Sequence, residues 1–265
     1  MAFSIEKIRA DDYGSVAPQL NSVETADPFA YVDLIQEPEN CTLHVARNEG
    51  RVVAYLHLYQ QKYAIYRLAG DADGASMLLK NIGSGPAILM CQAHLMEAMK
   101  SAFPSAPSYM EYLMTVGREE ENTSGSDSAV RLEPAYAEQL FNLYASGEFS
   151  SRTAFNSIDS YRALLESEPT FGILDDFKLV SAATAFSGSS SFGMVGGVFT
   201  SREHRGKGYG TSVASAATRH VLSVSDNSLL YVRTDNGNAI SAYEKIGYRH
   251  RERWAFFDIG TGIVP

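Results

Sequence analysis

The chain has 265 residues, of which 45 % are hydrophobic and 20 % charged, enough for one large globular domain or two of ordinary size. The net charge is −9, and residues 1–127 carry most of it, with 9 Lys and Arg against 17 Asp and Glu. This acidic half disfavours nucleic acid as a partner, because phosphate backbones attract the opposite charge. It favours a cationic substrate or partner, with a solvated acidic surface as the simpler alternative.

The first residues of the sequence and its cysteines do not indicate export or a membrane. The first nine residues place charged side chains among apolar ones, unlike a secretory signal. No apolar run approaches the ~18 residues of a membrane span. Cys41 and Cys91 fit no metal-ligand spacing. We therefore expect a reduced cytoplasmic protein with no bound metal and no membrane partner.

The first half predicts a mixture of strands and helices. Alternating apolar residues and turn signals predict a strand at its start and a hairpin around Asn48 to Gly50. The expected elements are, in order, a strand at 4–9, two short helices within 11–39, a hairpin at 41–59, a strand at 64–68, a turn at 70–74, helices at 76–81 and 87–103, and a strand at 109–116.

Residues 119–128 are charged and rich in Ser and Gly, with no apolar side chain, which is typical of a linker. We place the domain boundary there, which gives domains 1–127 and 128–265. The second half then repeats the opening order of strand, two helices and hairpin, which favours internal duplication with one diverged copy. Its expected elements are strands at 129–134, 171–174, 179–186, 192–200, 229–234 and 248–259, and helices at 136–146, 158–166, 211–222 and 238–246. Hairpins combined with a parallel crossover predict an α/β fold with a mixed antiparallel and parallel sheet flanked by helices.

The second half contains one glycine-rich loop between a strand and a helix. It reads Arg205-Gly206-Lys207-Gly208-Tyr209-Gly210, followed by Thr211. Glycines allow positive φ and close approach of a ligand, and the helix start offers backbone N–H groups, so the loop predicts a phosphate site. The pattern differs from the dinucleotide fingerprint and from the P-loop, because Lys207 is not followed by Ser or Thr at the loop end.

A second segment lies one helix and one strand further along. Residues 230–248 read Leu-Tyr-Val-Arg-Thr-Asp-Asn-Gly-Asn-Ala-Ile-Ser-Ala-Tyr-Glu-Lys-Ile-Gly-Tyr. Together the two segments strongly resemble the signatures of the GNAT superfamily of N-acetyltransferases. The specific motifs cover residues 198–248, the element order extends the resemblance over 129–265, and the first half looks like a degenerate GNAT-like domain. The matching residues are Arg205, Gly208, Gly210, Asn236, Ala239, Tyr243, Glu244, Lys245, Gly247 and Tyr248.

The resemblance implies acetyl-CoA as acyl donor and no metal. It implies that the CoA pyrophosphate is bound by the loop backbone, with Arg205 at the start of the loop. The backbone groups are those of Gly206, Lys207, Gly208, Tyr209, Gly210 and Thr211. It further implies that the main chain of Val198, Phe199 and Thr200 pairs with the pantetheine amides and that a backbone N–H there polarises the thioester carbonyl. Asn236 is expected to touch the cofactor arm, and Tyr243 to give a proton to the leaving thiolate.

Each of these residues also has a structural interpretation. Tyr243 lies in an apolar helix stripe, and Asn236 fits a turn and helix cap. Lys207 fits a solvated cation near phosphate, and His204 a bystander. The sequence leaves these alternatives open.

One feature of many relatives is missing. An ammonium must lose a proton before attack, and many relatives place a glutamate on one of two strands for this purpose. The strand at 192–200 has no carboxylate, and Tyr231 stands where the later strand often has one. The remaining candidate bases are Glu148, Asp175, Asp176 or ordered water.

The resemblance implies an N-acetyltransferase that moves an acetyl group from acetyl-CoA to a primary amine of a small molecule or peptide, by direct attack in a ternary complex. The missing base and the diverged first half favour, as the alternative, a non-catalytic acyl-CoA-binding module. Binding of ATP or NAD at the loop is disfavoured by the second segment. The acidic first half is expected either to cover the acceptor site or to form the face of a homodimer.

Overall fold

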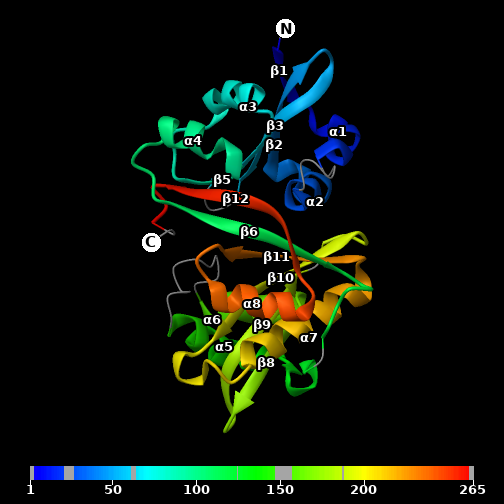
Figure 1. Ribbon diagram of the computed structural model, residues 1–265, viewed down its shortest axis with the longest axis vertical. Coiled ribbons are helices and arrows are strands. Elements are labelled where there is room, and N and C mark those ends of the chain that lie inside the picture. The colour runs from blue at the N-terminus through cyan, green and yellow to red at the C-terminus, as the bar shows by residue number, and fades with distance from the viewer. Residues whose placement is uncertain are drawn as a thin grey trace. The chain divides into compact units, whose positions relative to one another are not determined.

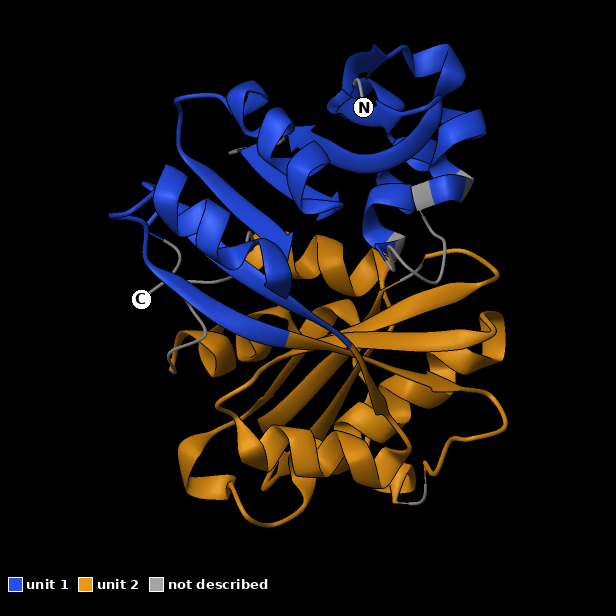
Figure 2. Cartoon of the chain, turned by 45° about the horizontal axis from the view of Figure 1, so that its top comes forward, with its two compact units in different colours: residues 1–111, 252–265 blue, residues 112–251 orange. Residues whose placement is uncertain are grey.

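The computed structural model describes residues 3–20, 27–60, 64–123, 125–146, 157–186 and 188–262, and they divide into two units (Figure 2). Unit 1 comprises residues 1–111 and 252–265, and unit 2 comprises residues 112–251. Both boundaries fall inside strands, so this division differs from the expected one at 127/128. The assignment of domains 1–127 and 128–265 stays a prediction.

Unit 1 is a mixed sheet with helices on both faces. Its sheet has the order β1-β2-β3-β4-β5-β12, antiparallel throughout except for the parallel pair β4 and β5. Its elements, most of them labelled in Figure 1, are β1 (Phe3–Ile8), α1 (Tyr13–Leu20), α2 (Pro28–Gln36), β2 (Cys41–Asn48), β3 (Arg51–Gln60), β4 (Ala64–Gly70), α3 (Ala72–Leu78), β5 (Ala87–Gln92), α4 (Met96–Ala102), the start of β6 (Ser108–Gly117) and most of β12 (Arg249–Ile259).

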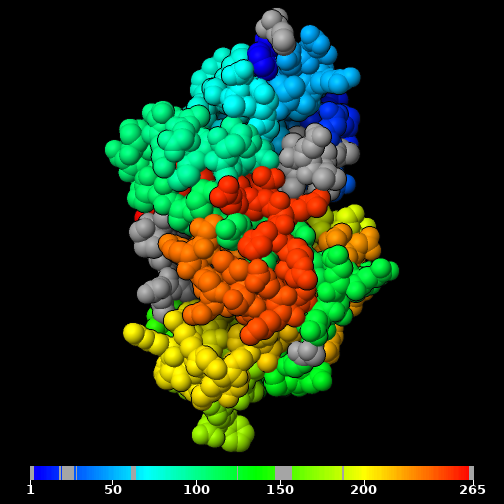
Figure 3. All heavy atoms as spheres, viewed as in Figure 1, coloured from blue at the N-terminus to red at the C-terminus, as the bar shows by residue number. Residues whose placement is uncertain are grey.

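Unit 2 repeats this plan. Its sheet has the order β6-β11-β10-β9-β8-β7, in which β10 and β11 are the parallel pair. Its remaining elements are β7 (Val130–Arg131), α5 (Ala137–Ala145), α6 (Ile158–Ser167), β8 (Thr170–Asp175), β9 (Lys178–Phe186), β10 (Phe192–Thr200), α7 (Tyr209–Val224), β11 (Asn227–Arg233) and α8 (Gly237–Ile246). Figure 3, drawn in the same view as Figure 1, shows the molecule from the side of α8.

The two halves of the chain exchange their last strands. β12 follows α8 of unit 2 in sequence, yet it pairs antiparallel with β5 of unit 1, from Trp254 opposite Gln92 to Ile259 opposite Ala87. β6 follows α4 of unit 1, yet its residues 112–117 lie beside β11 in unit 2. Each sheet is therefore completed by a strand from the other half of the sequence.

The helices of unit 2 cover opposite faces of its sheet. Leu179 and Ala182 of β9 belong to a buried cluster with α5 and α6. Val180 and Ala183 belong to another cluster with α7. Because neighbouring residues of a strand point to opposite faces, α5 and α6 lie on one face and α7 on the other. A third cluster packs α8 against α7, β6 and β11.

Two expectations for the first half are wrong. The helix expected at 87–103 is a strand, Ala87–Gln92, followed by the short helix Met96–Ala102. β5 is a central strand with a nearly continuous apolar run, and such a run cannot be distinguished from a buried helix by periodicity. The turn expected at 70–74 contains the start of α3, because the Asp71 carboxylate accepts hydrogen bonds from the N–H groups of Asp73 and Gly74, both at 3.0 Å.

The described residues of the segment 119–128, expected to be a linker, pack within unit 2. Thr123 and Ser126 are buried. Arg219 of α7 donates from Nε to the Thr123 hydroxyl at 3.3 Å and from Nη1 to the Asp127 carboxylate at 3.1 Å. The polar residues that suggested a linker therefore pair with a guanidinium on the helix.

Candidate functional site

The sheet of unit 2 opens between its two parallel strands. β10 and β11 pair over only three residues each, Phe192–Met194 with Asn227–Leu229. Beyond Met194 the edge of β10 that faced β11 has backbone groups available to an extended ligand. The predicted cofactor-binding residues Val198, Phe199 and Thr200 lie on this diverging part of β10.

A β-bulge distorts β10 at the opening. Gly196 pairs with Thr184 of β9 and Phe199 pairs with Ala182, so two residues of β10 stand opposite one residue of β9. Gly197, inside the bulge, has φ +62°. Tyr144 of α5 donates a hydrogen bond from its hydroxyl to the Gly197 carbonyl at 2.5 Å. A Cβ on Gly197 would lie 2.8 Å from that hydroxyl, so only glycine fits.

The glycine loop ends at the N-terminus of α7. Gly206 and Gly208 have φ +80° and +84°, conformations that glycine adopts without strain. A Cβ built on either glycine meets no atom within 4 Å, so the loop backbone is open to a ligand. Gly208 is the N-cap residue of α7 and no described side chain caps the helix. The N–H groups of the first helical turn are therefore available, and the helix dipole favours an anion there.

The loop contains two cationic side chains, Arg205 and Lys207. Arg205 turns back toward β10, where its Nε donates to the Thr200 carbonyl at 3.2 Å and its guanidinium lies 5.8 Å from the centre of the Phe199 ring. Lys207 Nζ lies 3.6 Å from the Asp175 carboxylate and 5.7 Å from the centre of the Tyr209 ring. Arg205 thus braces the loop on the strand, and Lys207 is half exposed beside it.

The candidate bases lie in different surroundings. The Asp175 carboxylate, in addition to Lys207, lies 3.4 Å from His204 Nε2, and His204 Nδ1 is 2.6 Å from the Ser201 hydroxyl. Asp175 therefore connects the end of β8 to the loop through Lys207 and His204, and His204 also contacts Ser201. Asp176 is exposed in the turn at φ +48°. Glu148 lies outside the described residues.

Two predicted site residues, Asn236 and Tyr243, belong to α8 and its N-cap. Asn236 is the N-cap residue of α8, and its Oδ1 accepts a hydrogen bond from the Ala239 N–H at 3.2 Å. Tyr243 is 7 % exposed and packs edge-on against Tyr248, 6.0 Å between ring centres. Val198 of β10 packs against the apolar cluster that contains Tyr243, so these two predicted site residues belong to the same part of the core.

Tyr248 has a structural role in this cluster. Its hydroxyl lies 2.9 Å from the Thr218 hydroxyl and 2.6 Å from the Ser228 hydroxyl. Burial raises the pKa of Tyr248 to about 12, so it stays protonated. It ties the turn after α8 to α7 and β11 and holds the ring against which Tyr243 packs.

The described residues of unit 1 do not repeat the open features of unit 2. β4 and β5 stay paired over five residues each, Ala64–Leu68 with Ala87–Cys91. The N-terminus of α3 is capped by Asp71, whose carboxylate accepts from the amides that would otherwise be available to an anion. In unit 1 the sheet therefore stays closed and the helix start is filled by a negative side chain.

The face of the unit 1 sheet beneath α2 holds a buried ion pair. Arg67 Nε donates to both carboxylate oxygens of Asp27, at 2.6 and 2.7 Å, and the Tyr55 hydroxyl donates to the same carboxylate at 2.9 Å. The guanidinium lies 5.1 Å from the ring centre of Phe29 and 5.2 Å from that of Trp254. Removing one partner of such a pair costs about 3–5 kcal/mol, so the pair fixes this face.

Two titratable groups lie near this pair. Burial, with the charges of Asp27 and Glu37 adding to it and that of Arg67 opposing it, raises the pKa of Asp33 to about 7. Burial lowers the pKa of His57 to about 4. Its Nδ1 has no hydrogen-bond partner among the described residues, and its Nε2 lies 3.4 Å from Cys41 Sγ.

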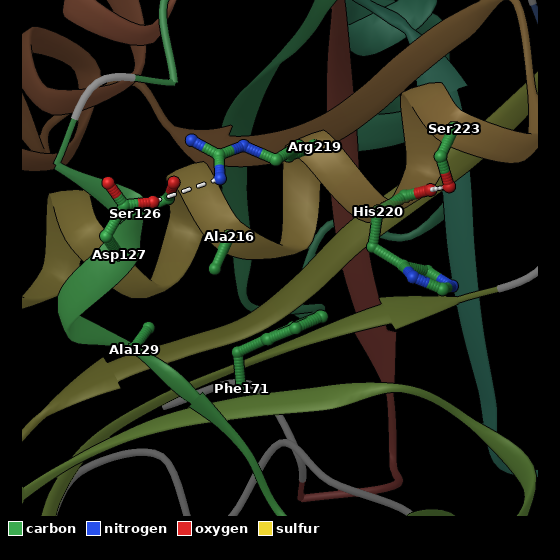
Figure 4. Close-up of a pocket in the computed structure, with 8 residues that line it drawn as sticks. All are labelled: Ser126, Asp127, Ala129, Phe171, Ala216, Arg219, His220 and Ser223. Atoms are coloured by element: carbon green, nitrogen blue, oxygen red, sulfur yellow. Dashed lines mark hydrogen bonds and ion pairs between the residues drawn. The ribbon is translucent and has the colours of Figure 1, made fainter.

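A cavity of about 350 Å³ lies on α7, on the helix side turned toward residues 126–129 (Figure 4). It contains none of the predicted site residues, and Arg219 at its edge is already paired with Asp127. Its lining residues are Ser126, Asp127, Ala129, Phe171, Ala216, Arg219, His220 and Ser223. The described residues contain no group of three His, Cys, Asp or Glu side chains that could hold a metal ion. None of the described helices combines the length and apolar character that crossing a membrane requires.

Comparison with known proteins agrees with this architecture. Residues 170–256 match the model of the family described as FR47-like protein. A Drosophila protein of solved structure aligns with a TM-score of 0.72 at 12 % identity, covering 96 % of this chain and 97 % of that one. A GCN5-related N-acetyltransferase-like protein from Streptococcus suis aligns with a TM-score of 0.63 at 15 % identity, covering 94 % and 98 %. A tandem GNAT protein from the clavulanic acid biosynthesis pathway aligns with a TM-score of 0.57 at 17 % identity, covering 98 % and 99 %. Among curated proteins, none matches this sequence.

The predicted resemblance and fold class are confirmed. The chain has the mixed α/β fold of tandem GNAT N-acyltransferases, and the alignment with the tandem GNAT structure spans 98 % of it, including the first half, where the sequence carries no motif. The FR47-like match covers β8 to β12, which include the opening, the glycine loop and α8.

Proposed function

We propose that this protein is an acyl-CoA-dependent N-acyltransferase, which moves an acetyl group from acetyl-CoA to a primary amine of a small molecule or peptide. The observation that carries the proposal is the opening between β10 and β11, which leads to the uncapped N-terminus of α7. An extended chain with amides and a pyrophosphate at one end has the chemistry that these two features recognise. The corresponding strands and helix of unit 1, β4, β5 and α3, have neither feature, so the site is assigned to unit 2.

Each part of the site is assigned one task. The backbone from Gly206 to Thr211 binds the pyrophosphate, with Arg205 and Lys207 adding positive charge. The main chain of Val198, Phe199 and Thr200 pairs with the pantetheine amides. Asn236 uses Oδ1 to cap α8, so its contact with the cofactor arm goes through Nδ2.

The reaction is a direct attack in a ternary complex. Acetyl-CoA supplies a thioester, the neutral amine of the acceptor forms the new C–N bond, and the C–S bond breaks. Tyr243 gives a proton to the leaving thiolate, whose conjugate acid has a pKa near 8.5, so a weak acid suffices. The proton lost by the acceptor goes to ordered water, because Asp175 is engaged with Lys207 and His204.

The absence of a carboxylate on β10 also favours a second candidate, a non-catalytic acyl-CoA-binding module. The two candidates predict the same binding and different turnover. Calorimetry with acetyl-CoA tests the shared part, and thiol release against amines, polyamines, amino acids, aminoglycosides and peptides tests the difference. We expect binding at one site and turnover with at least one amine class. Binding without turnover across the panel would favour the second candidate, and absence of binding would contradict both.

The remaining assignments follow the same proposal. Both cysteines are buried and unpaired, which suits a reducing cytoplasm. We propose no nucleic-acid, membrane or metal partner. A homodimer is proposed on the acidic first half and is tested by light scattering.

A further inference from the structure

We propose that Tyr144 is a positioning residue for acyl transfer, which aims the backbone N–H of Val198 at the thioester carbonyl. This inference rests on the proposed function and adds a residue that no sequence motif indicates. It starts from the hydrogen bond between the Tyr144 hydroxyl and the Gly197 carbonyl.

The bonded carbonyl and the Val198 N–H belong to one peptide unit. In a planar trans peptide the C=O and the N–H point in opposite directions. The bulge places residues 197 and 198 opposite only one residue of β9, which disturbs the hydrogen-bond ladder at the peptide group between them. The orientation of this peptide group is then set by the hydrogen-bond partner of its carbonyl, which is Tyr144.

The Val198 N–H points toward the side of the sheet on which acyl transfer is proposed to take place. Tyr144 belongs to α5, which covers one face of the sheet, so the Val198 N–H points away from that face. α7 lies on the other face, and α8 packs against α7. The Val198 side chain packs against the cluster that contains Tyr243. An N–H donor and the proposed proton donor thus converge on the same side of β10, as the carbonyl and the sulfur of one thioester require.

Tyr144 is held firmly enough for this task. It is 3 % exposed, and its ring stacks on Tyr161 with 5.6 Å between ring centres and lies 5.9 Å from that of Phe199. Burial raises the pKa of Tyr144 above its usual range, so the hydroxyl remains a neutral donor at every working pH. Such a residue orients a peptide and exchanges no proton with substrate.

The test uses Tyr144→Phe, which removes the hydroxyl and keeps the ring. Tyr161→Phe is the matched control, because it makes the same change on the neighbouring ring of the stack. The main readout is the infrared carbonyl frequency of [1-¹³C]acetyl-CoA bound to the full chain, which needs no acceptor. We expect a shift to lower frequency in the native protein and in Tyr161→Phe, and a frequency close to that of free acetyl-CoA in Tyr144→Phe.

Binding and kinetics complete the test. The Kd for CoA, which has no acyl group, should stay within about twofold in Tyr144→Phe, and with an active amine kcat should fall ~10–100-fold by the same factor from pH 6 to 9. The thermal unfolding midpoint of Tyr144→Phe, measured beside that of Tyr161→Phe, shows whether the variant is folded, and a folded variant with an unchanged carbonyl frequency contradicts the proposal.

Three outcomes would overturn the inference. They are a native carbonyl frequency equal to that of free acetyl-CoA, an unchanged shift in Tyr144→Phe, or a parallel loss of CoA binding, which would indicate a purely structural role. Failure of the native protein to bind acetyl-CoA would remove the proposed function and this inference together, and the calorimetry distinguishes that case from the other three.

Discussion

The carboxylate of Asp71 accepts a hydrogen bond from the backbone N–H of Gly74 at 3.0 Å, at the start of α3 in unit 1. The corresponding helix start in unit 2 follows Gly208, which has no side chain to offer. The same strand-loop-helix arrangement is therefore closed to anions in one unit and open in the other.

The chain should bind one acetyl-CoA and not two. Isothermal titration calorimetry should give a stoichiometry near one, because unit 1 has a capped helix and a closed pair of strands. Asp71→Gly should not add a second site, since the pairing of β4 with β5 remains. A stoichiometry of two in the native chain would show that Asp71 does not block unit 1.

Gly208→Asp should abolish acetyl-CoA binding. Its side chain would place a negative charge at the helix start and strain a residue with φ +84°. Gly50→Asp is the matched control, because Gly50 has φ +80° in a turn of unit 1 and its Cβ position is equally open. Both variants should lose about 1 kcal/mol of stability from strain, and only Gly208→Asp should lose the thermal shift that acetyl-CoA produces. Retention of that shift would contradict the assignment of the loop.

Tyr243→Phe should slow thiol release ~10²-fold and leave the Kd for acetyl-CoA unchanged. Loss of a general acid affects the transition state more than ground-state binding. The measurement is kcat by thiol detection, with Tyr248→Phe as the comparison, since that hydroxyl bonds only to Thr218 and Ser228 among the described residues. An unchanged kcat in Tyr243→Phe would assign this residue to the core alone.

Asp33→Asn should stabilise the protein increasingly as pH rises. The folded pKa of about 7 exceeds the ordinary value of 3.8, so the folded chain retains a proton that the unfolded chain has lost. The native protein therefore loses stability as pH rises between these two values, and the asparagine variant avoids that loss. The difference should be near zero at pH 4 and reach about 1–4 kcal/mol at pH 8.

Urea unfolding at pH 4 to 8 measures this difference. The low pKa of His57, about 4, adds a stability that rises with pH between about 4 and 6.5 in both proteins, so only the difference between them reports Asp33. Asp12→Asn, at an exposed position of the same unit, is the control and should show no pH-dependent gain. An equal gain in both variants would contradict the role of burial at Asp33.

The parts that sequence could predict are those where local chemistry leaves few alternatives. Gly206 and Gly208 signalled a loop with positive φ, and Gly247 ends α8 at φ +112°, as expected for a C-cap glycine. Asn236 fitted a helix cap from its place between Asp235 and Gly237, and the structure confirms that cap. These features depend on a few adjacent residues.

The parts that sequence missed depend on distant ones. The partner of the Tyr144 hydroxyl lies 53 residues further along the chain, and no local pattern indicates it. β5 resembled a helix because burial on both faces removed its alternation. The pairing of β12 with β5, and of β6 with β11, cannot be predicted from either strand alone, because the apolar residues of a strand do not specify which neighbour it pairs with.

The path of β12 has a consequence for dissecting the protein. Because unit 1 is made of residues 1–111 and 252–265, unit 2 is an uninterrupted insertion within it. A fragment cut at residue 128 would lack β6 and carry β12 without its partner β5, leaving exposed strand edges that favour aggregation. A recombinant fragment spanning residues 112–251 keeps β7 to β11 whole together with residues 112–117 of β6, and a tether between residues 111 and 252 would make unit 1 one continuous polypeptide.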